Sequence, residues 1–318
     1  MDSSASTDAT RQTTPDTVIL EPAAPPRMGL AAGLVRTARP RQWAKNVLIF
    51  AAPFAAGIIG HEGVWWRLAV TFAAFCALSS GGYFFNDALD VDRDRSHPRK
   101  RLRPIAAGTV PLPVAYVTGT LLFAVGFALS IWMGSEVAAV AAAYVALTVG
   151  YSYWLKHEPV VEMVLLALAF VLRAAAGGEA VGVSLSPWFT VVVSFGALLV
   201  VAGKRYAEQT AHDVASTQTR QVLERYPDGF LRFVWAMAAT ITVTGYCLWA
   251  LLPAKGPHIP APWPAISVIP FVVGILRYAM LLEAGSGEAP EDLFLRDRIL
   301  QLSGVIWVAI YAIGLYAR

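Results

Sequence analysis

Three residues with oxygen-bearing side chains recur at every fourth position in a largely apolar part of the chain. They are Asn86, Asp90 and Asp94, within the segment NDALDVDRD. On a helix, each four-residue step advances by about 40°, so the three side chains share one face within roughly 80°. A hard cation such as Mg²⁺ prefers a few carboxylates together with water and substrate phosphates. The spacing therefore predicts a Mg²⁺ site that these residues hold, and an ion-paired interfacial loop is the alternative.

A run of basic residues follows the acidic motif directly. The segment His97–Pro104 reads HPRKRLRP, and its Lys100, Arg101 and Arg103 are of the types that bind phosphate. Attraction to anionic lipid head groups is the alternative role, worth about 1 kcal/mol per residue. The acidic motif and the basic run together predict a Mg²⁺–diphosphate site at a membrane face, with the three motif residues as its catalytic centre.

Two further candidates lie among apolar residues, where they can meet a lipid substrate. Tyr83 is three residues before Asn86, about one helical turn deeper, so its hydroxyl can reach a lipid phosphate. A packed interfacial tyrosine is the alternative. Arg173 interrupts an apolar stretch, and an arginine inside a membrane is a functional-site candidate. Snorkelling, or an ion pair with Glu179, is the alternative for Arg173.

A second charged segment, Tyr151–Glu162, reads YSYWLKHEPVVE. Lys156 is its candidate phosphate ligand. Glu158 and Glu162 are four residues apart, so on a helix they share a face and offer a second metal or diphosphate site. The alternative is an ordinary helix N-terminus, with Pro159 in the first turn and acidic side chains favoured by the helix dipole.

Basic residues of two more segments complete the candidate substrate-binding set. Arg41 and Lys45 belong to RTARPRQWAKN, which can also be a basic membrane flank with an interfacial Trp. Lys204 follows an apolar segment, where it is either a phosphate ligand or a stop-transfer charge. Cys76 and Cys247 both lie in apolar runs and are expected to be buried, not to form a disulfide or a metal site.

The composition identifies the elements that must position these residues. Of the 318 residues, 56% are hydrophobic and only 15% are charged, whereas soluble domains carry about 25% charged residues. We therefore predict an all-α polytopic membrane protein with nine transmembrane helices in a close-packed bundle. The expected spans are 44–60, 65–85, 112–132, 136–155, 160–180, 187–204, 230–252, 264–282 and 299–317.

The positions of the Lys and Arg residues indicate the orientation. With the N-terminus in the cytoplasm, most of the 25 Lys and Arg residues fall on cytoplasmic flanks and loops, and the opposite face carries only Arg67, Lys255 and Arg318. This asymmetry predicts a cytoplasmic N-terminus. The acidic motif then lies on the cytoplasmic face.

The chain is expected to divide into two parts. Residues 1–28 are rich in Ser, Thr, Ala and Pro and are predicted to be a disordered cytoplasmic tail. Residues 29–318 are predicted to form one transmembrane transferase domain. Its polar cytoplasmic loops follow even-numbered spans, so we expect them to converge over the active site; they are 86–111, 151–162 and 204–230.

These residues resemble the UbiA superfamily of intramembrane prenyltransferases. The matching segments are NDALDVDRD from Asn86, Arg103–Pro104 and YSYWLK from Tyr151. The resemblance covers roughly residues 35–318 and implies a helical bundle around a central cavity, with a polar cap that binds Mg²⁺ and a diphosphate. Many aromatic prenyltransferases carry DxxxD as a second acidic motif, whereas this chain has glutamates at 158 and 162.

A closer resemblance is to the branch that uses phosphoribosyl diphosphate as donor and a polyprenyl (decaprenyl) phosphate as acceptor. Its product feeds cell-wall arabinan synthesis, which implies a bacterial plasma membrane. The segments that carry it are RPRQWAKN, FNDALDVDRDRSHPRKRLRPIAAG, FVLRAAAG and GKRYAE, which begin at Arg39, Phe85, Phe170 and Gly203.

The chemistry of this branch suits the residues present. A lipid phosphate is largely dianionic at pH 7, because its second pKa is about 6, so it needs no strong general base to attack the ribose. Mg²⁺ and cationic groups stabilise the departing diphosphate. Two rival functions stay open: an aromatic prenyltransferase of quinone or haem biosynthesis, and a transporter of lipid-linked sugars. Nucleic acid is not an expected partner, and a homo-oligomer is left open.

Overall fold

The computed structural model describes residues 28–98, 100–214, 222–251, 262–285, 293–294 and 296–316. Every regular element in these ranges is a helix, which confirms the all-α prediction. Except for Met28, the expected tail of residues 1–28 lies outside the described residues.

Eight of the described helices are long and apolar enough to cross a membrane, and they match eight of the nine predicted spans. Predominantly apolar runs of about 20 residues favour helices here, because every backbone polar group must be paired in lipid. The eight are α3 (Val64–Leu89), α5 (Leu112–Met133), α6 (Ser135–Tyr153), α7 (Val161–Ala180), α8 (Pro187–Val214), α9 (Phe230–Leu251), α10 (Trp263–Glu283) and α12 (Arg298–Tyr316).

The first predicted span, 44–60, is divided. After α1 (Leu30–Ala38), the chain forms a 3₁₀ helix, η1 (Pro40–Phe50), and then the short α2 (Ala51–Ala55). Pro53 cannot donate a backbone hydrogen bond, and Gly57 at φ 71° takes the chain out of the helical region. The predicted count of nine spanning helices is therefore not confirmed, and the orientation stays a prediction.

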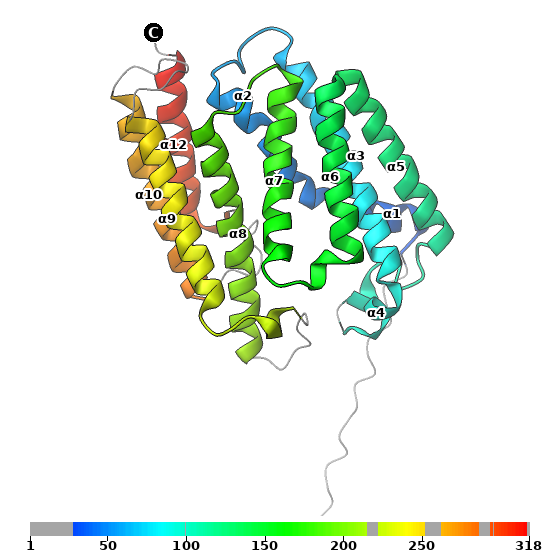
Figure 1. Cartoon of the computed structure of the whole chain (residues 1–318). Coiled ribbons are helices and arrows are strands. Elements are labelled where there is room, and N and C mark those ends of the chain that lie inside the picture. The colour runs from blue at the N-terminus through cyan, green and yellow to red at the C-terminus, as the bar shows by residue number, and fades with distance from the viewer. Residues whose placement is uncertain are drawn as a thin grey trace, which may run out of the picture.

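The long helices form one bundle in which neighbours along the chain are mostly neighbours in space (Figure 1). Helix α3 packs against α5 and α6, α7 lies between α6 and α8, and α10 packs against α9 and α12. The η1 segment crosses α7 at Gly177, where a Cβ atom would lie 1.8 Å from the carbonyl oxygen of Ile49. Only glycine permits so close an approach of the two backbones.

Four short helices gather at one end of the bundle, at the bottom of Figure 1. We refer to it as the α4 end. The helices are α4 (Val91–Ser96), η2 (Lys100–Leu102), η3 (Leu155–His157) and η4 (Leu223–Arg225).

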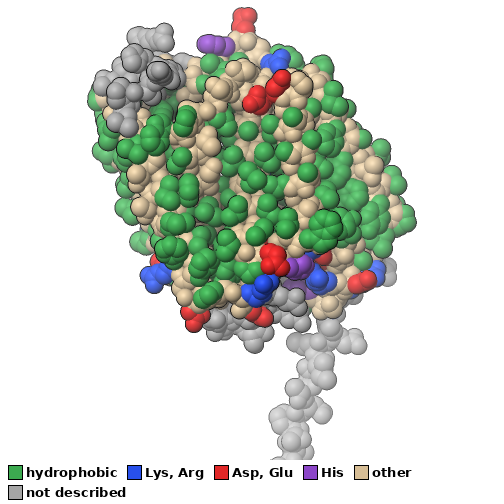
Figure 2. Space-filling view, in the orientation of Figure 1, with side chains coloured by type: hydrophobic (Ala, Val, Ile, Leu, Met, Phe, Trp, Pro, Cys, Tyr) green, Lys and Arg blue, Asp and Glu red, His purple; other side chains and the backbone are tan. Residues whose placement is uncertain are grey.

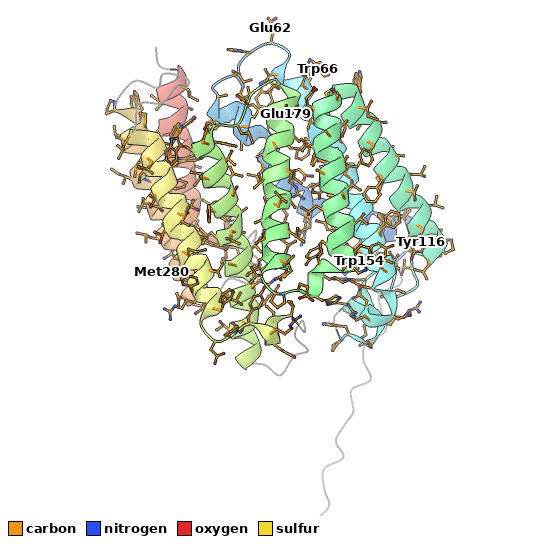
Figure 3. The ribbon with its side chains drawn as sticks, viewed as in Figure 1. Glu62, Trp66, Tyr116, Trp154, Glu179 and Met280 are labelled. Carbon is orange, nitrogen blue, oxygen red and sulfur yellow. The ribbon has the colours of Figure 1, made fainter. Side chains whose placement is uncertain are left out.

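The surface has an apolar band between two charged ends (Figure 2). Exposed tryptophans lie near both borders of this band. Trp66 is close to Glu62 at one end, and Trp154 lies toward the α4 end (Figure 3). Their exposed fractions are 47% and 75%. Aromatic belts of this kind form at the two membrane–water interfaces, so the bundle axis runs across the membrane.

Candidate active site

The acidic motif lies where α3 passes into α4. Asn86 belongs to the last turn of α3, Asp90 joins the two helices, and Asp94 lies in α4. The backbone N–H of Asp90 donates to the Asn86 carbonyl (3.0 Å), and that of Asp94 to the Asp90 carbonyl (2.8 Å). The three residues are therefore successive, one helical turn apart, at the α4 end.

Asp90 presents its carboxylate to cations from two elements. The Lys156 ammonium lies 2.8 and 3.0 Å from its two carboxylate oxygens, and the Arg93 guanidinium lies 3.6 Å away. The side chains of Asp90 and Lys156 are 19% and 14% exposed. This ion pair joins the acidic motif to η3, which is 66 residues further along the chain.

The polar loop 204–230, in its described part, contacts the loop 151–162. The backbone N–H of Val160 donates to the Tyr226 hydroxyl (2.7 Å), and the Arg225 guanidinium donates to the His157 carbonyl (2.8 Å). Burial, and then the Lys156 ammonium, lower the pKa of His157, so its imidazole is neutral at pH 7. These contacts join described parts of the three loops, and their convergence over an active site stays a prediction.

Behind the motif lies an arginine–aspartate cluster, formed by the buried Asp87 and Asp94 and the half-buried Arg39 and Arg103. Arg39 Nη2 donates to both carboxylate oxygens of Asp87 (2.6 and 2.9 Å). Arg103 Nη1 bridges Asp87 (3.1 Å) and Asp94 (2.7 Å). The guanidinium of Arg39 also lies 4.7 Å from the centre of the Tyr83 ring. Tyr83, a predicted lipid-contact residue, thus supports this cluster.

The cluster changes the role expected of Asp94. Its side chain is 3% exposed, and this burial raises the pKa of its carboxyl, while the charge of Arg103 opposes the rise. Because Asp94 is directed at Arg103, it would have to exchange that partner to bind a metal. Asn86 and Asp90 are the more accessible members of the motif.

Other predicted phosphate ligands lie at different depths. Lys100 is half-buried in η2, and its positive charge, like that of Arg103, opposes the rise in the pKa of Asp94 that burial causes. Arg101 is exposed and donates to the Pro98 carbonyl (3.3 Å). Arg41 is exposed and Lys45 half-buried, both in η1.

The prediction that Glu158 and Glu162 share a helix face is wrong. Glu158 is extended, and α7 begins only after Val160, whose φ of 64° is strained for a β-branched residue. Glu158 is 57% exposed and lies 3.6 Å from Arg225. Glu162 is fully buried and accepts two hydrogen bonds from Arg205 (2.7 and 2.8 Å). Within the described structure, the two glutamates do not form one metal site.

Helix α8 continues past the point where the sequence suggested an end. Lys204 and Arg205 lie inside α8, which runs to Val214, because neither glycine nor proline interrupts the segment after them. Arg205 also donates to Glu208 (2.7 Å), and the half-buried Lys204 makes no ion pair with the motif in the parts described. The sequence did not predict the Glu162–Arg205 pair, because its partners are 43 residues apart and belong to different helices.

Arg173 makes its contacts inside the bundle. It donates to the side chains of Asn46 (2.7 Å) and Tyr144 (2.9 Å) and to the Ala169 carbonyl (2.6 Å). Asn46 in turn donates to the buried Cys76 sulfur (3.2 Å). Glu179, the ion-pair partner considered from the sequence, is not among these partners. Arg173 ties η1 to α6 and α7.

The motif fits a Mg²⁺ ion that takes few protein ligands. In the described residues, no group of three His, Cys, Asp or Glu side chains is arranged to hold a metal. Asn86 and Asp90 nevertheless offer hard oxygen donors one turn apart, and both oxygens of Asp90 already face one cation, Lys156. Mg²⁺ often binds through one or two carboxylates and completes its shell with water and substrate phosphates.

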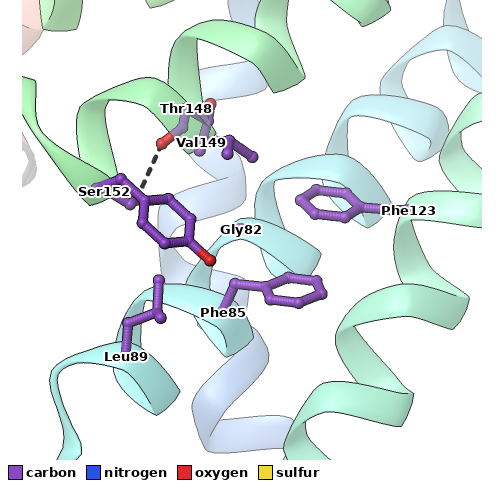
Figure 4. Close-up of a pocket in the computed structure, with 8 residues that line it drawn as sticks. Gly82, Phe85, Leu89, Phe123, Thr148, Val149 and Ser152 are labelled. Atoms are coloured by element: carbon purple, nitrogen blue, oxygen red, sulfur yellow. Dashed lines mark hydrogen bonds between the residues drawn. The ribbon is translucent and has the colours of Figure 1, made fainter.

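A small apolar cavity adjoins the motif between α3, α5 and α6 (Figure 4). Its volume is about 140 Å³. Phe85 and Phe123 stack on one side of it at 5.3 Å. The hydroxyls of Thr148 and Ser152 are already engaged, since they donate to the carbonyls of Tyr144 (2.8 Å) and Thr148 (2.9 Å). The lining fits hydrocarbon and not phosphate.

The chain is similar in sequence to transferases that act on polyprenyl substrates. It is 43% identical over 295 residues to a decaprenyl-phosphate phosphoribosyltransferase of Corynebacterium glutamicum, covering 92% of this chain and 89% of that protein. It is 40% identical over 306 residues to the enzyme of the same name from Mycolicibacterium smegmatis, covering 93% and 96%. A 4-hydroxybenzoate octaprenyltransferase of Polaromonas is 28% identical over 164 residues, which are 51% of this chain and 57% of that protein.

Solved structures share the fold. A UbiA homologue from Archaeoglobus fulgidus, bound to GPP and Mg²⁺, has a TM-score of 0.66 at 19% identity and covers 90% of this chain and 98% of that one. The model of the UbiA prenyltransferase family matches residues 47–305. This chain therefore belongs to the UbiA prenyltransferase family.

Proposed function

We propose that this protein transfers 5-phosphoribose from phosphoribosyl diphosphate to a polyprenyl phosphate, most simply decaprenyl phosphate, and releases diphosphate. The observation that carries the proposal is the identity of 40–43% to decaprenyl-phosphate phosphoribosyltransferases over about nine-tenths of the chain. The product is a precursor for cell-wall arabinan, made in a bacterial plasma membrane.

The arrangement of charges supports this reaction. The two substrates bring a diphosphate, a 5-phosphate and a lipid phosphate to one site. Lys156 and Arg93 contact Asp90, and Lys100 and Arg101 lie on the neighbouring basic loop. Cations at the edge of the motif bind phosphate oxygens. In the proposed orientation this end of the bundle faces the cytoplasm, where a soluble phosphorylated sugar is found.

The bond changes are those of a substitution at the anomeric carbon. An oxygen of the lipid phosphate forms a bond to C1 of the ribose, while the bond from C1 to the diphosphate oxygen breaks. The electron pair of that bond leaves with diphosphate. Lys156 releases Asp90 and binds the diphosphate, and Arg103 keeps Asp87 and Asp94 in place behind the motif.

The reaction is proposed to depend on Mg²⁺, held by Asn86 and Asp90, with Asp94 beside them. When bound, the ion would neutralise charge that develops on the leaving diphosphate. The fully buried Glu162 takes no part, because its carboxylate is engaged by Arg205.

One assay tests the proposal against the aromatic prenyltransferase. Purified protein in detergent is given radiolabelled phosphoribosyl diphosphate and decaprenyl phosphate with Mg²⁺, and we expect a labelled lipid and free diphosphate. A parallel reaction contains a polyprenyl diphosphate and 4-hydroxybenzoate. Prenylated hydroxybenzoate without any labelled lipid would overturn the proposal. Movement of a lipid-linked sugar across liposomes without turnover would favour a transporter instead.

A further inference from the structure

A groove lies where the chain turns from α1 into η1, with a volume of about 890 Å³. The turn is made by Arg39, whose φ of 54° and ψ of 59° are left-handed and uncommon for a residue other than glycine. The bend makes the outer side of α1 and the start of η1 the two walls of the groove. Its lining includes Ala31, Val35, Arg36, Arg39, Pro40 and Arg41.

The three arginines of the groove differ in their partners. Arg39 is fixed by its hydrogen bonds to Asp87. Arg36 and Arg41 are exposed, and neither side chain has a hydrogen bond or an ion pair to any other described residue. Two guanidinium groups that share a groove without carboxylate partners suit a phosphate, which they can bind through paired N–H donors.

The apolar surface beside these arginines indicates that the phosphate belongs to a lipid. On α1, Leu30 and Val35 are 46% and 61% exposed. The opposite side of α1 is held at the α4 end, since Gly33 lies against Thr109 and Val110 of the segment that leads into α5. An amphipathic helix so placed lies in the membrane interface. A ligand that fits both walls carries a phosphate and a hydrocarbon chain.

Arg39 connects the groove with the acidic motif. It lines the groove, and its guanidinium bonds Asp87, which is adjacent in sequence to Asn86. We propose that the groove binds the phosphate of the polyprenyl phosphate acceptor through Arg36 and Arg41, with Arg39 as a positioning residue. This inference rests on the proposed function. It assigns Arg36 and Arg41 to the acceptor phosphate and leaves the cations around the acidic motif to the donor.

The test is the double variant Arg36→Gln/Arg41→Gln in the full-length protein. We expect its KM for decaprenyl phosphate to rise about tenfold or more, since charge-assisted hydrogen bonds are lost. The KM for phosphoribosyl diphosphate stays unchanged, which also shows that the variant folds. Arg298→Gln is the matched control: it removes an exposed arginine at the start of α12 and leaves both constants unchanged.

Binding of decaprenyl phosphate to the protein without donor is measured in parallel, and the double variant is expected to bind it about tenfold more weakly. An active double variant with wild-type acceptor KM and wild-type affinity would overturn the groove as the acceptor site. Lost binding to phosphatidylglycerol vesicles with an unchanged acceptor KM would also overturn it, and would make the groove a membrane anchor. If the wild type binds decaprenyl phosphate through these arginines but transfers no phosphoribose, the proposed function fails and the groove assignment stands.

Discussion

Two charged sites at the α4 end pair an acid with a base, and they differ in exposure. Between α7 and α8, Glu162 and Arg205 are 0% and 3% exposed and form two hydrogen bonds. Between the acidic motif and η3, Asp90 and Lys156 are 19% and 14% exposed. Both pairs have nearly the same donor–acceptor distances, so distance alone does not distinguish a structural pair from a functional one.

The difference lies in what can replace each partner. Glu162 is fully buried, and its two oxygens are already bound in a fork by Arg205, an arrangement that is costly to break once buried. Asp90 can exchange the single ammonium of Lys156 for a metal ion, and Lys156 can then bind phosphate. The buried pair therefore stabilises the fold, and the half-exposed pair is suited to turnover.

Removing the charge of Glu162 is expected to give the largest effect. In Glu162→Gln, Arg205 stays buried without a counter-charge from α7, which destabilises the protein by about 3–5 kcal/mol. Thermal unfolding in detergent, followed by circular dichroism, measures the loss. The paired replacement Glu162→Leu/Arg205→Met is the control, because it leaves no fully buried charge unpaired and should recover most of the stability; only the partly exposed Glu208 loses a partner. A single variant as stable as the wild type would show that the pair does not stabilise the bundle.

The second prediction concerns Asp90→Asn. This change keeps the shape of the side chain and removes the charge that holds a cation, so activity should fall on the order of 10²–10³-fold. The melting temperature should stay close to that of the wild type, since Asp90 is partly exposed. Transfer of labelled phosphoribose and thermal unfolding are measured on the same preparation. Full activity in this variant would contradict the proposed metal role of the motif.

The third prediction separates the two partners of the half-buried pair, Asp90 and Lys156. Lys156→Met removes the cation that occupies Asp90, so Mn²⁺ should bind the donor-free protein about tenfold more tightly. The KM for phosphoribosyl diphosphate should rise, because a phosphate ligand is lost. Mn²⁺ binding is followed by electron paramagnetic resonance and KM by the transfer assay. Weaker Mn²⁺ binding in the variant would mean that Lys156 helps to form the metal site instead of competing for it.

Sequence alone predicted the parts of this site that depend on local spacing. Eight long apolar segments indicated eight of the helices, and the four-residue repeat from Asn86 placed the motif at the end of one of them. Pairs between distant segments were not predictable, because hydrophobic periodicity says nothing about which helices are neighbours. Arg39 with Asp87, Arg205 with Glu162 and Arg173 with Asn46 are separated by 48, 43 and 127 residues.

Strained backbone at the start of α7 was also not predictable from the sequence. The positive φ of Val160, whose backbone N–H donates to the Tyr226 hydroxyl, turns the chain so that the side chains of Glu158 and Glu162 do not share a helix face. Spacing of four predicts a shared face only within a continuous helix. A proline at 159 was compatible with a helix start, and it gave no sign that the helix would begin two residues later.

The smallest effect is expected for Glu158→Gln, which tests whether this glutamate behaves like Asp90 or like a surface residue. Glu158 is 57% exposed and 3.6 Å from the equally exposed Arg225, and such ion pairs contribute about 0–1 kcal/mol. We expect the stability to change by no more than about 0.5 kcal/mol and the transfer rate to stay near that of the wild type. Arg225→Gln removes the other partner of the pair and is the matched control. If Glu158→Gln instead loses activity to the same extent as Asp90→Asn at unchanged stability, Glu158 reaches the substrates in a conformation that brings it toward the motif. An exposed carboxylate at this end of the bundle could then act in the reaction without contacting the acidic motif before the substrates bind.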